Sequence, residues 1–146
     1  MKPLLLALAG SLFLTLSAFA GDEADVAAAT DAWRAAIDAR DPQAVSSLYD
    51  PQALLYATFQ TRLDSPKKIL SYFKHLTEKP DLKVKFHRQD IRVFDGDAAI
   101  NSGLYVFSYS EDGRTVSVPA RYTFVYVKDG GDWKIINHHS SVDPEN

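Results

Sequence analysis

Apolar residues recur at intervals of three and four between residues 23 and 39, which is the spacing of one face of an α-helix. Polar residues fill the positions in between. We therefore expect an amphipathic helix over residues 23–39. Its apolar face consists of Val26, Ala29, Trp33, Ala36 and Ile37.

Two pairs that end in proline indicate further helix starts, at Asp41-Pro42 and Ser65-Pro66. In each pair the first residue is a preferred N-cap, and proline suits the first helical position. We expect a short helix that ends before Asp50-Pro51 and a longer one that ends near Lys79-Pro80. The apolar face of the longer helix consists of Ile69, Leu70, Phe73 and Leu76.

After residue 80 the hydrophobic period changes to two, which is typical of β-strands with one buried face. Three turn signals divide this region into four strands joined as hairpins. The turn signals are Asp95-Gly96-Asp97, Glu111-Asp112-Gly113 and 129–132. An apolar and aromatic run from Ala53 to Phe59 predicts one earlier strand.

The predicted order is thus α-α-β-α-β-β-β-β, an α+β fold. We expect the helices to pack on one face of a strongly curved antiparallel sheet and to enclose a pocket against it. In the first of the four later strands the apolar positions are even up to Phe86 and odd from Ile91. This switch predicts a β-bulge between His87 and Asp90.

The first 20 residues follow a different pattern. Lys2 precedes an apolar run from Leu4 to Phe19, and Ala18-Phe19-Ala20 matches an A-x-A cleavage site. We expect residues 1–20 to be a signal peptide and 21–146 to be one domain, which places the mature protein in the periplasm or outside the cell. The run is shorter than the roughly 20 residues of a membrane span, so we expect no membrane association after cleavage.

Composition excludes several kinds of chemistry. The 146 residues include no cysteine, which excludes thiol catalysis and cysteine-ligated metals. The formal net charge is −3, and acidic residues interrupt the densest basic stretch, residues 79–92. Nucleic acid is therefore not an expected partner.

The end of the chain carries a family resemblance. The run Ala120–Tyr126, a D-G-G-D turn and the run Trp133–Ser141 resemble bacterial proteins similar to the association domain of calcium/calmodulin-dependent protein kinase II. These belong to the wider NTF2-like, SnoaL-like group. The similarity extends from about Ala28 to Pro144 and includes Trp33, Leu48-Tyr49-Asp50-Pro51, Tyr72-Phe73 and Ser102-Gly103-Leu104-Tyr105.

This resemblance implies a conical, cystatin-like fold with a pocket at its open end. It also implies self-association through the sheet, as a homodimer or a larger ring. It implies no kinase activity, because nothing here resembles an ATP-binding glycine-rich loop or a kinase catalytic loop. The pocket of the kinase domain is rich in arginine, whereas the matching positions here hold Phe124 and Ser140.

Two adjacent histidines, His138 and His139, are the first candidates for chemistry. Consecutive side chains on a strand point to opposite faces, so these rings do not readily grip one ion. With no other chelating spacing in the chain, we expect no metal and no cofactor. One ring is expected to be packed and the other exposed; the alternative is an inward-facing imidazole that acts as a base or binds a ligand.

Arg121 is the candidate cation of the pocket, because it is the one charged residue in the apolar run 116–127. Its neighbours depend on the last hairpin. A two- or four-residue loop sets Tyr122 opposite His139, and a three-residue loop sets Arg121 there. The sequence leaves both registers open. The predicted pocket residues are Arg121, Tyr122, His138, His139 and Tyr105.

Aromatic residues alternate along two neighbouring strands and predict one ladder across the sheet. They are Tyr105, Phe107, Tyr109, Tyr122, Phe124 and Tyr126. Such a ladder lines a pocket or builds a dimer interface, and we favour the interface.

The sequence therefore favours an exported, self-associating domain that binds a small organic ligand. The alternative is a small SnoaL-like isomerase or hydrolase that uses His139 or Asp90 as its base in an apolar pocket. In related folds an aspartate works beside a tyrosine in this way, as in ketosteroid isomerase. Asp90 is otherwise a solvated carboxylate between Arg88 and Arg92.

Overall fold

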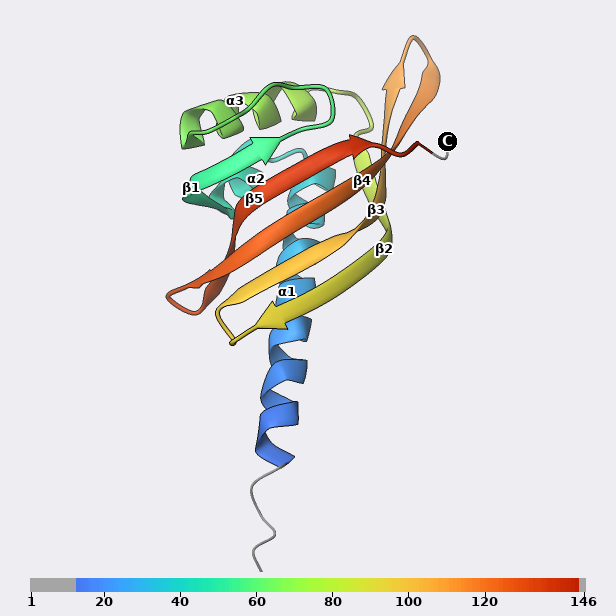
Figure 1. Cartoon of the computed structure of the whole chain (residues 1–146). Helices are drawn as coiled ribbons and strands as arrows, with labels where there is room; N and C mark the ends of the chain where they lie inside the picture. Colours follow the sequence, from blue (N-terminus) through green and yellow to red (C-terminus); the bar gives the residue numbers. More distant parts are fainter. Residues whose placement is uncertain (1–12, 145–146) are drawn as a thin grey trace, which may run out of the picture.

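The computed structural model describes residues 13–144, with side chains from residue 21 onward. Its helices and strands follow the predicted order and confirm the α+β fold (Figure 1). They are α1 (Phe13–Asp38), α2 (Pro42–Ser47), β1 (Tyr49–Tyr56), α3 (Pro66–Thr77), β2 (Lys83–Phe94), β3 (Ala98–Glu111), β4 (Arg114–Asp129) and β5 (Asp132–Val142).

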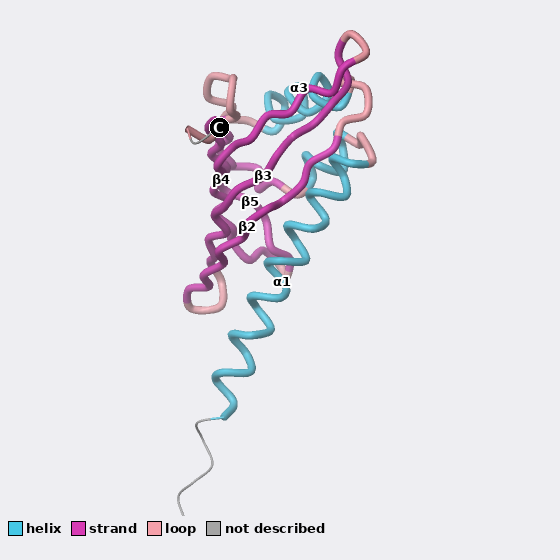
Figure 2. Tube along the Cα trace, turned by 90° about the vertical axis from the view of Figure 1, so that its right-hand side faces the viewer, coloured by secondary structure: helices cyan, strands magenta, loops and turns pink. Residues whose placement is uncertain are grey.

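The strands form one five-stranded, curved sheet in the order β1-β5-β4-β3-β2. Figure 2 shows the helices on one side of this sheet, where α1 crosses it and α3 covers one end. Neighbouring strands from β5 to β2 are antiparallel, but β1 pairs with β5 in parallel. The prediction of a purely antiparallel sheet is wrong at this edge, because α3 and three strands separate β1 from β5 and allow a crossover connection.

The predicted caps start α2 and α3. The Asp41 side chain accepts a hydrogen bond from the Ala44 amide at 2.9 Å, and Ser65 Oγ accepts one from the Lys68 amide at 3.4 Å. Strand β1 begins earlier than expected, at Tyr49 instead of Ala53. It passes through Asp50-Pro51 because its register with β5 is irregular between Tyr49 and Leu54, where proline needs no ladder partner.

The predicted bulge in β2 lies at His87, since Phe86 pairs with Tyr105 and Arg88 with Leu104. Gly103 makes room for it. A Cβ atom at this position would collide with the carbonyl oxygen of Arg88, so only glycine fits the bulge without a shift.

A second bulge, at Ile136 in β5, makes both predicted registers of the last hairpin wrong. Lys128 pairs with Trp133 as in the first alternative, but the extra residue moves every later pair by one. His139 lies opposite Thr123, and Tyr122 lies opposite Ser140.

The predicted signal peptide, residues 1–20, lies partly outside the described residues. The backbone of residues 13–20 forms the first turns of α1, which extend past the edge of the sheet (Figure 1). Within residues 13–144, no helix is both long and apolar enough to cross a membrane. Cleavage after Ala20 stays a prediction.

Trp33 of α1 lies at the centre of the core. Its ring is within 5.2–6.4 Å of the rings of Phe124, His138, Phe107, Phe86, Phe73 and Tyr105. The predicted aromatic ladder is therefore core: Tyr105, Tyr122, Phe124 and Tyr126 are buried beneath the helices. Our preference for a dimer interface on these residues is wrong, because the inward positions of β3 and β4 face α1.

Candidate ligand-binding cavity

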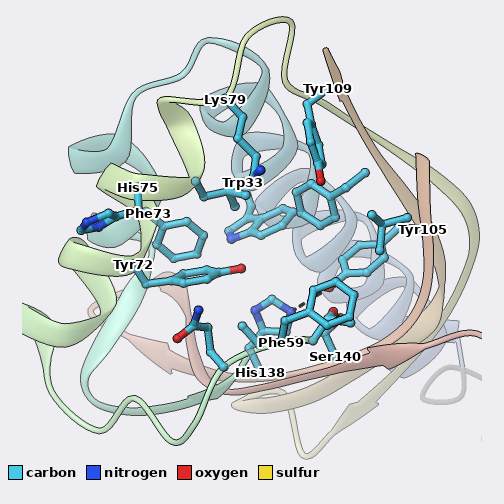
Figure 3. Close-up of a pocket in the computed structure, with 16 residues that line it drawn as sticks. Trp33, Phe59, Tyr72, Phe73, His75, Lys79, Tyr105, Tyr109, His138 and Ser140 are labelled. Atoms are coloured by element: carbon cyan, nitrogen blue, oxygen red, sulfur yellow. Dashed lines mark hydrogen bonds between the residues drawn. The ribbon is translucent and has the colours of Figure 1, made fainter. Parts of the chain in front are cut away.

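A cavity of about 300 Å³ lies between α3, α1 and the concave face of the sheet. Figure 3 shows aromatic side chains around it and polar groups at its floor, where β5 passes beneath. The lining residues are Trp33, Ala57, Thr58, Phe59, Gln60, Tyr72, Phe73, His75, Leu76, Lys79, Tyr105, Phe107, Tyr109, Val118, His138 and Ser140. Its size suits a small metabolite.

The walls follow from the helical and strand periodicities. Trp33 points from the apolar face of α1 toward β3, where its ring stacks near Tyr105 at 6.4 Å and 16°. Phe73 comes from the apolar face of α3 and meets Trp33 edge-on at 6.3 Å. Phe59, on the segment between β1 and α3, is 72% exposed although it borders the cavity. The wall at this side is open to solvent.

His138 forms the floor and belongs to a chain of hydrogen bonds. Its Nδ1 atom lies 2.8 Å from the Tyr49 hydroxyl, and the Trp33 indole N–H donates to that same hydroxyl at 3.1 Å. Its Nε2 atom lies 3.3 Å from the Tyr105 hydroxyl. Both ring nitrogens are therefore engaged.

The hydroxyl groups beside His138 extend this chain. Ser140 is a neighbour of Tyr105 that acts on the pKa of its hydroxyl, and the Ser140 Oγ atom lies 2.6 Å from Oγ1 of Thr58. Tyr105, Ser140 and Thr58 all line the cavity. The floor thus presents several hydroxyl groups that are already linked to one another.

Burial keeps this floor uncharged. Desolvation, followed by the charge of His139, lowers the pKa of His138 to about 3, so the ring is neutral at ordinary pH. Desolvation also raises the pKa of Tyr72 to about 12 and that of Tyr105 further. An apolar ligand with a hydrogen-bonding group fits these surroundings better than an ion.

The Tyr72 hydroxyl points into the cavity from α3 (Figure 3). Within residues 21–144 no hydrogen-bond partner of this hydroxyl is found. Lys79 is the cation at the rim: its Nζ atom lies 3.8 Å from the centre of the Tyr109 ring. It forms no ion pair with a described acidic residue.

The structure separates the predicted pocket residues. Tyr105 and His138 line the cavity, but His139 is exposed on the other face of β5, as expected for consecutive strand residues. Arg121 is also exposed on the outer face, contrary to our expectation, because the inward positions of β4 are even-numbered. It borders a shallow depression beside Arg88 and Asp143.

Tyr122 faces inward but does not reach the cavity. Its hydroxyl donates to the carbonyl oxygen of Arg88 at 3.2 Å and to Oδ1 of Asn101 at 3.0 Å. Asp90 is exposed, lies 2.7 Å from Arg88 Nε and borders the same open depression as Arg121 and Tyr122. Neither proposed base, His139 or Asp90, lines the cavity.

Phe124 and Ser140, which stand where the pocket of the kinase domain is rich in arginine, have different surroundings in the structure. Phe124 is buried against the His138 ring at 4.4 Å, and Ser140 lines the cavity. No arginine is among the lining residues. Among the described residues, no group of three or more histidine, cysteine, aspartate or glutamate side chains is arranged to hold a metal ion.

Sequence reasoning missed Trp33, Tyr49 and Tyr72 as site residues. Trp33 and Tyr72 carry no signal that separates a cavity wall from ordinary core, since both lie on helix faces that must be buried anyway. Tyr49 precedes the strand that we expected. Nothing in the sequence around Tyr49 indicated the His138 contact.

Solved structures with low sequence identity to this chain identify its class of fold. An NTF2-like protein with a cystatin-like fold from Novosphingobium aromaticivorans has a TM-score of 0.78 at 12% identity, over 93% of both chains. A ketosteroid isomerase-like protein from Erwinia carotovora atroseptica has a TM-score of 0.73 at 15% identity, over 83% of this chain and 95% of that one. These neighbours show an NTF2-like fold.

The family follows from closer similarity. A family model of the calcium/calmodulin dependent protein kinase II association domain matches residues 22–144, and the chain belongs to this family. A Xanthomonas campestris protein assigned to the same domain is 39% identical, with a TM-score of 0.77 over 83% of this chain and 87% of that one. A comparison with curated proteins gave no match.

Proposed function

We propose that this protein is an exported, self-associating domain that binds a small, mainly apolar organic ligand and has no kinase activity. One observation carries the ligand part: an aromatic cavity of about 300 Å³ with hydrogen-bonding groups gathered at one end. Such cavities are the usual form of small-molecule sites. The predicted leader at residues 1–20 supports export.

The geometry favours binding over acid–base catalysis. The alternative enzyme needs His139 or Asp90 at the cavity, and both are exposed elsewhere. His138 is present, but its depressed pKa makes it a weak base, and its two nitrogens already have partners. His75 also lines the cavity, but it is exposed, and its Nδ1 atom lies 2.7 Å from the Ser71 carbonyl oxygen, away from the polar floor (Figure 3).

Self-association is proposed through the outer face of the sheet, with a second copy of this chain as the occupant. The helices cover the opposite face (Figure 2), so aliphatic side chains on the outer positions stay partly exposed. They are Ile100, Leu104, Val106, Val125 and Val127. Membership of an association-domain family supports this use of an apolar sheet face.

Native mass spectrometry of the purified protein tests both parts together. We expect a dimer or larger ring that carries a small-molecule adduct. Val118→Phe adds a ring on the cavity lining and should remove the adduct, whereas Val116→Phe, on the same face of β4 but outside the lining, should keep it. A protein without adduct and without added-ligand binding contradicts the ligand proposal.

A second variant pair isolates the association. Val125→Glu places a charge in the centre of the outer face and should weaken association by at least tenfold in analytical ultracentrifugation. Phe59→Glu, on the helix side, is the control and should leave the subunit count unchanged. A monomeric parent protein at micromolar concentration would contradict self-association.

The export proposal has its own readout. Osmotic-shock fractions of a producing bacterium should contain the protein, and its N-terminal sequence should begin at Gly21. Retention of residues 1–20 on the mature chain would overturn it.

A further inference from the structure

The hydrogen-bonding groups at the floor of the cavity form one unbranched chain. Hydrogen bonds join Trp33 to Tyr49, Tyr49 to His138 and His138 to Tyr105. The chain continues to Ser140, a neighbour that acts on the pKa of Tyr105, and from Ser140 to Thr58 at 2.6 Å. Each member has one donor proton, because the histidine is neutral and the others are an indole and hydroxyl groups. Six protons and at most five contacts leave at least one proton unused.

The start of the chain fixes the direction of these bonds. Trp33 Nε1 donates a hydrogen bond to the Tyr49 hydroxyl, so the Tyr49 hydroxyl in turn donates a hydrogen bond to His138 Nδ1. His138 then carries its proton on Nε2 and donates it to Tyr105. The opposite tautomer would leave the Tyr49 hydroxyl proton buried without an acceptor, at a cost of about 1–3 kcal/mol.

The surplus proton consequently falls at the far end of the chain. If Tyr105 receives from Ser140, the free hydroxyl proton is its own; if Tyr105 donates to Ser140, the free proton is on Ser140 or Thr58. All three hydroxyls line the cavity. Whatever the orientation of the individual hydroxyls, the floor offers at least one uncommitted donor.

The charges around the floor restrict the matching ligand. No arginine lines the cavity, and Lys79 stands at the rim above the Tyr109 ring. A carboxylate placed at the floor would therefore lose its water without gaining a cation. The flat walls of Trp33, Phe73 and Tyr105 suit a planar skeleton.

We propose that the cavity selects uncharged, planar carbonyl compounds, whose oxygen accepts the surplus hydroxyl proton at the floor. This inference rests on the proposed ligand-binding function and adds the ligand class to it. Tyr105, Ser140 and Thr58 are the recognition residues, and Trp33, Tyr49 and His138 are positioning residues that set the direction of the donor.

Four probes with one phenyl skeleton test this inference by titration calorimetry on the purified protein: acetophenone, α-methylstyrene, benzoate and 1-phenylethylamine. Acetophenone and α-methylstyrene differ only by an oxygen in place of a methylene group. We expect acetophenone to bind about five- to tenfold more tightly than α-methylstyrene. Benzoate and the amine should bind more weakly than either.

The outcomes distinguish the hydroxyl donor at the floor from ligand binding by the cavity as a whole. Equal binding of acetophenone and α-methylstyrene overturns the donor but keeps the cavity as an apolar site. Tighter binding of benzoate or the amine overturns the choice of an uncharged acceptor. Failure of every probe to bind overturns ligand binding by this cavity and the inference with it.

A conservative triple variant locates the donor. In a Tyr72→Phe background, which removes the other free hydroxyl of the cavity, Thr58→Val, Ser140→Ala and Tyr105→Phe together remove the three floor hydroxyls. The preference for acetophenone should then vanish, while the affinity for α-methylstyrene changes less than twofold. An unchanged preference overturns the assignment. Two measurements on the parent protein do not depend on the folding of this variant.

The first is the infrared carbonyl stretch of bound acetophenone. It should lie at a lower frequency than in an alkane solvent, because the oxygen accepts a hydrogen bond; an alkane-like frequency overturns the inference. The second is the ¹⁵N spectrum of His138, which should show the proton on Nε2. A proton on Nδ1 would overturn the direction of the chain.

Discussion

The two faces of the sheet differ although the same strands build both. Toward the helices, β4 presents Tyr122, Phe124 and Tyr126, which are buried among other rings. On the outer face the alternating positions hold smaller side chains, Thr123, Val125 and Val127, which are only partly buried. The alternation of side chains along the strands therefore gives the two faces different roles. Large aromatic rings stabilise the fold and line the cavity on the inner face, and aliphatic side chains on the outer face are available to a partner.

The polar groups follow the same division. On the inner face Thr30, Asn101 and Tyr126 belong to one buried hydrogen-bond network, because Thr30 Oγ1 accepts from Asn101 Nδ2 and contacts the Tyr126 hydroxyl, both at 2.9 Å. On the outer face the Arg88–Asp90 pair is 67% and 48% exposed, so solvent screens it and it adds little stability. We therefore expect substitutions on the inner face to be the more costly.

The largest effect is expected for Trp33→Ala. This change removes the ring that contacts helix, sheet and cavity, and it should lower the free energy of unfolding by about 3–5 kcal/mol in urea denaturation. Thr123→Ala on the outer face is the matched control, expected within about 0.5 kcal/mol of the parent protein. Similar losses for the two variants would break the comparison between the faces.

Gly103→Ala should have the next largest effect, about 2–3 kcal/mol, because the added Cβ meets the Arg88 carbonyl of the bulge and overpacks it. Urea denaturation again provides the measurement. The neighbouring Ser102→Ala, whose side chain points outward, should stay within about 0.5 kcal/mol. A tolerated Gly103→Ala would mean that the bulge is not fixed in the way described.

A pH-dependent effect, smaller per pH unit, comes from His138. Burial lowers its pKa from 6.5 in the unfolded chain to about 3 in the folded protein. Between these values the unfolded state alone binds the proton, so stability falls as the pH falls, by about 1.4 kcal/mol per unit at most. Above pH 6.5 the contribution is complete.

Urea midpoints measured from pH 7 to pH 4 check this expectation. His138→Phe should show a shallower decline than the parent protein, whereas His139→Gln, on the outer face, should keep the parent's decline. Parallel profiles for His138→Phe and the parent would contradict a buried, neutral His138.

Most of the fold was predictable because local signals determine it. Asp41 and Ser65 mark helix starts by their own hydrogen bonds, and the change of apolar parity near His87 records a bulge in the sequence itself. The bulge at Ile136 left no such trace, because the buried positions after it hold the polar residues His138 and Ser140 and so record no change of apolar parity. The start of β1 at Tyr49 depends on pairing with a distant strand, which local propensity does not record.

The site was predictable only in part. The alternation of strand residues correctly separated His138 from His139, and Tyr105 was expected at a pocket. The same rule failed for Arg121, because its charge drew attention to it while the parity of its neighbours Tyr122 and Phe124 already placed it outward. Tyr49 is recognised only once the hydrogen bond to His138 is seen.

The contact between Tyr49 and His138 has a consequence for how the molecule is made. The two residues are 89 positions apart, and they meet through the parallel pairing of β1 with β5. A growing chain holds Trp33, Tyr49 and Tyr105 long before the ribosome adds the residue that links them. Closure of so long a loop is slow compared with helix and hairpin formation, so we expect the recognition end of the cavity to be among the last parts of the protein to take shape.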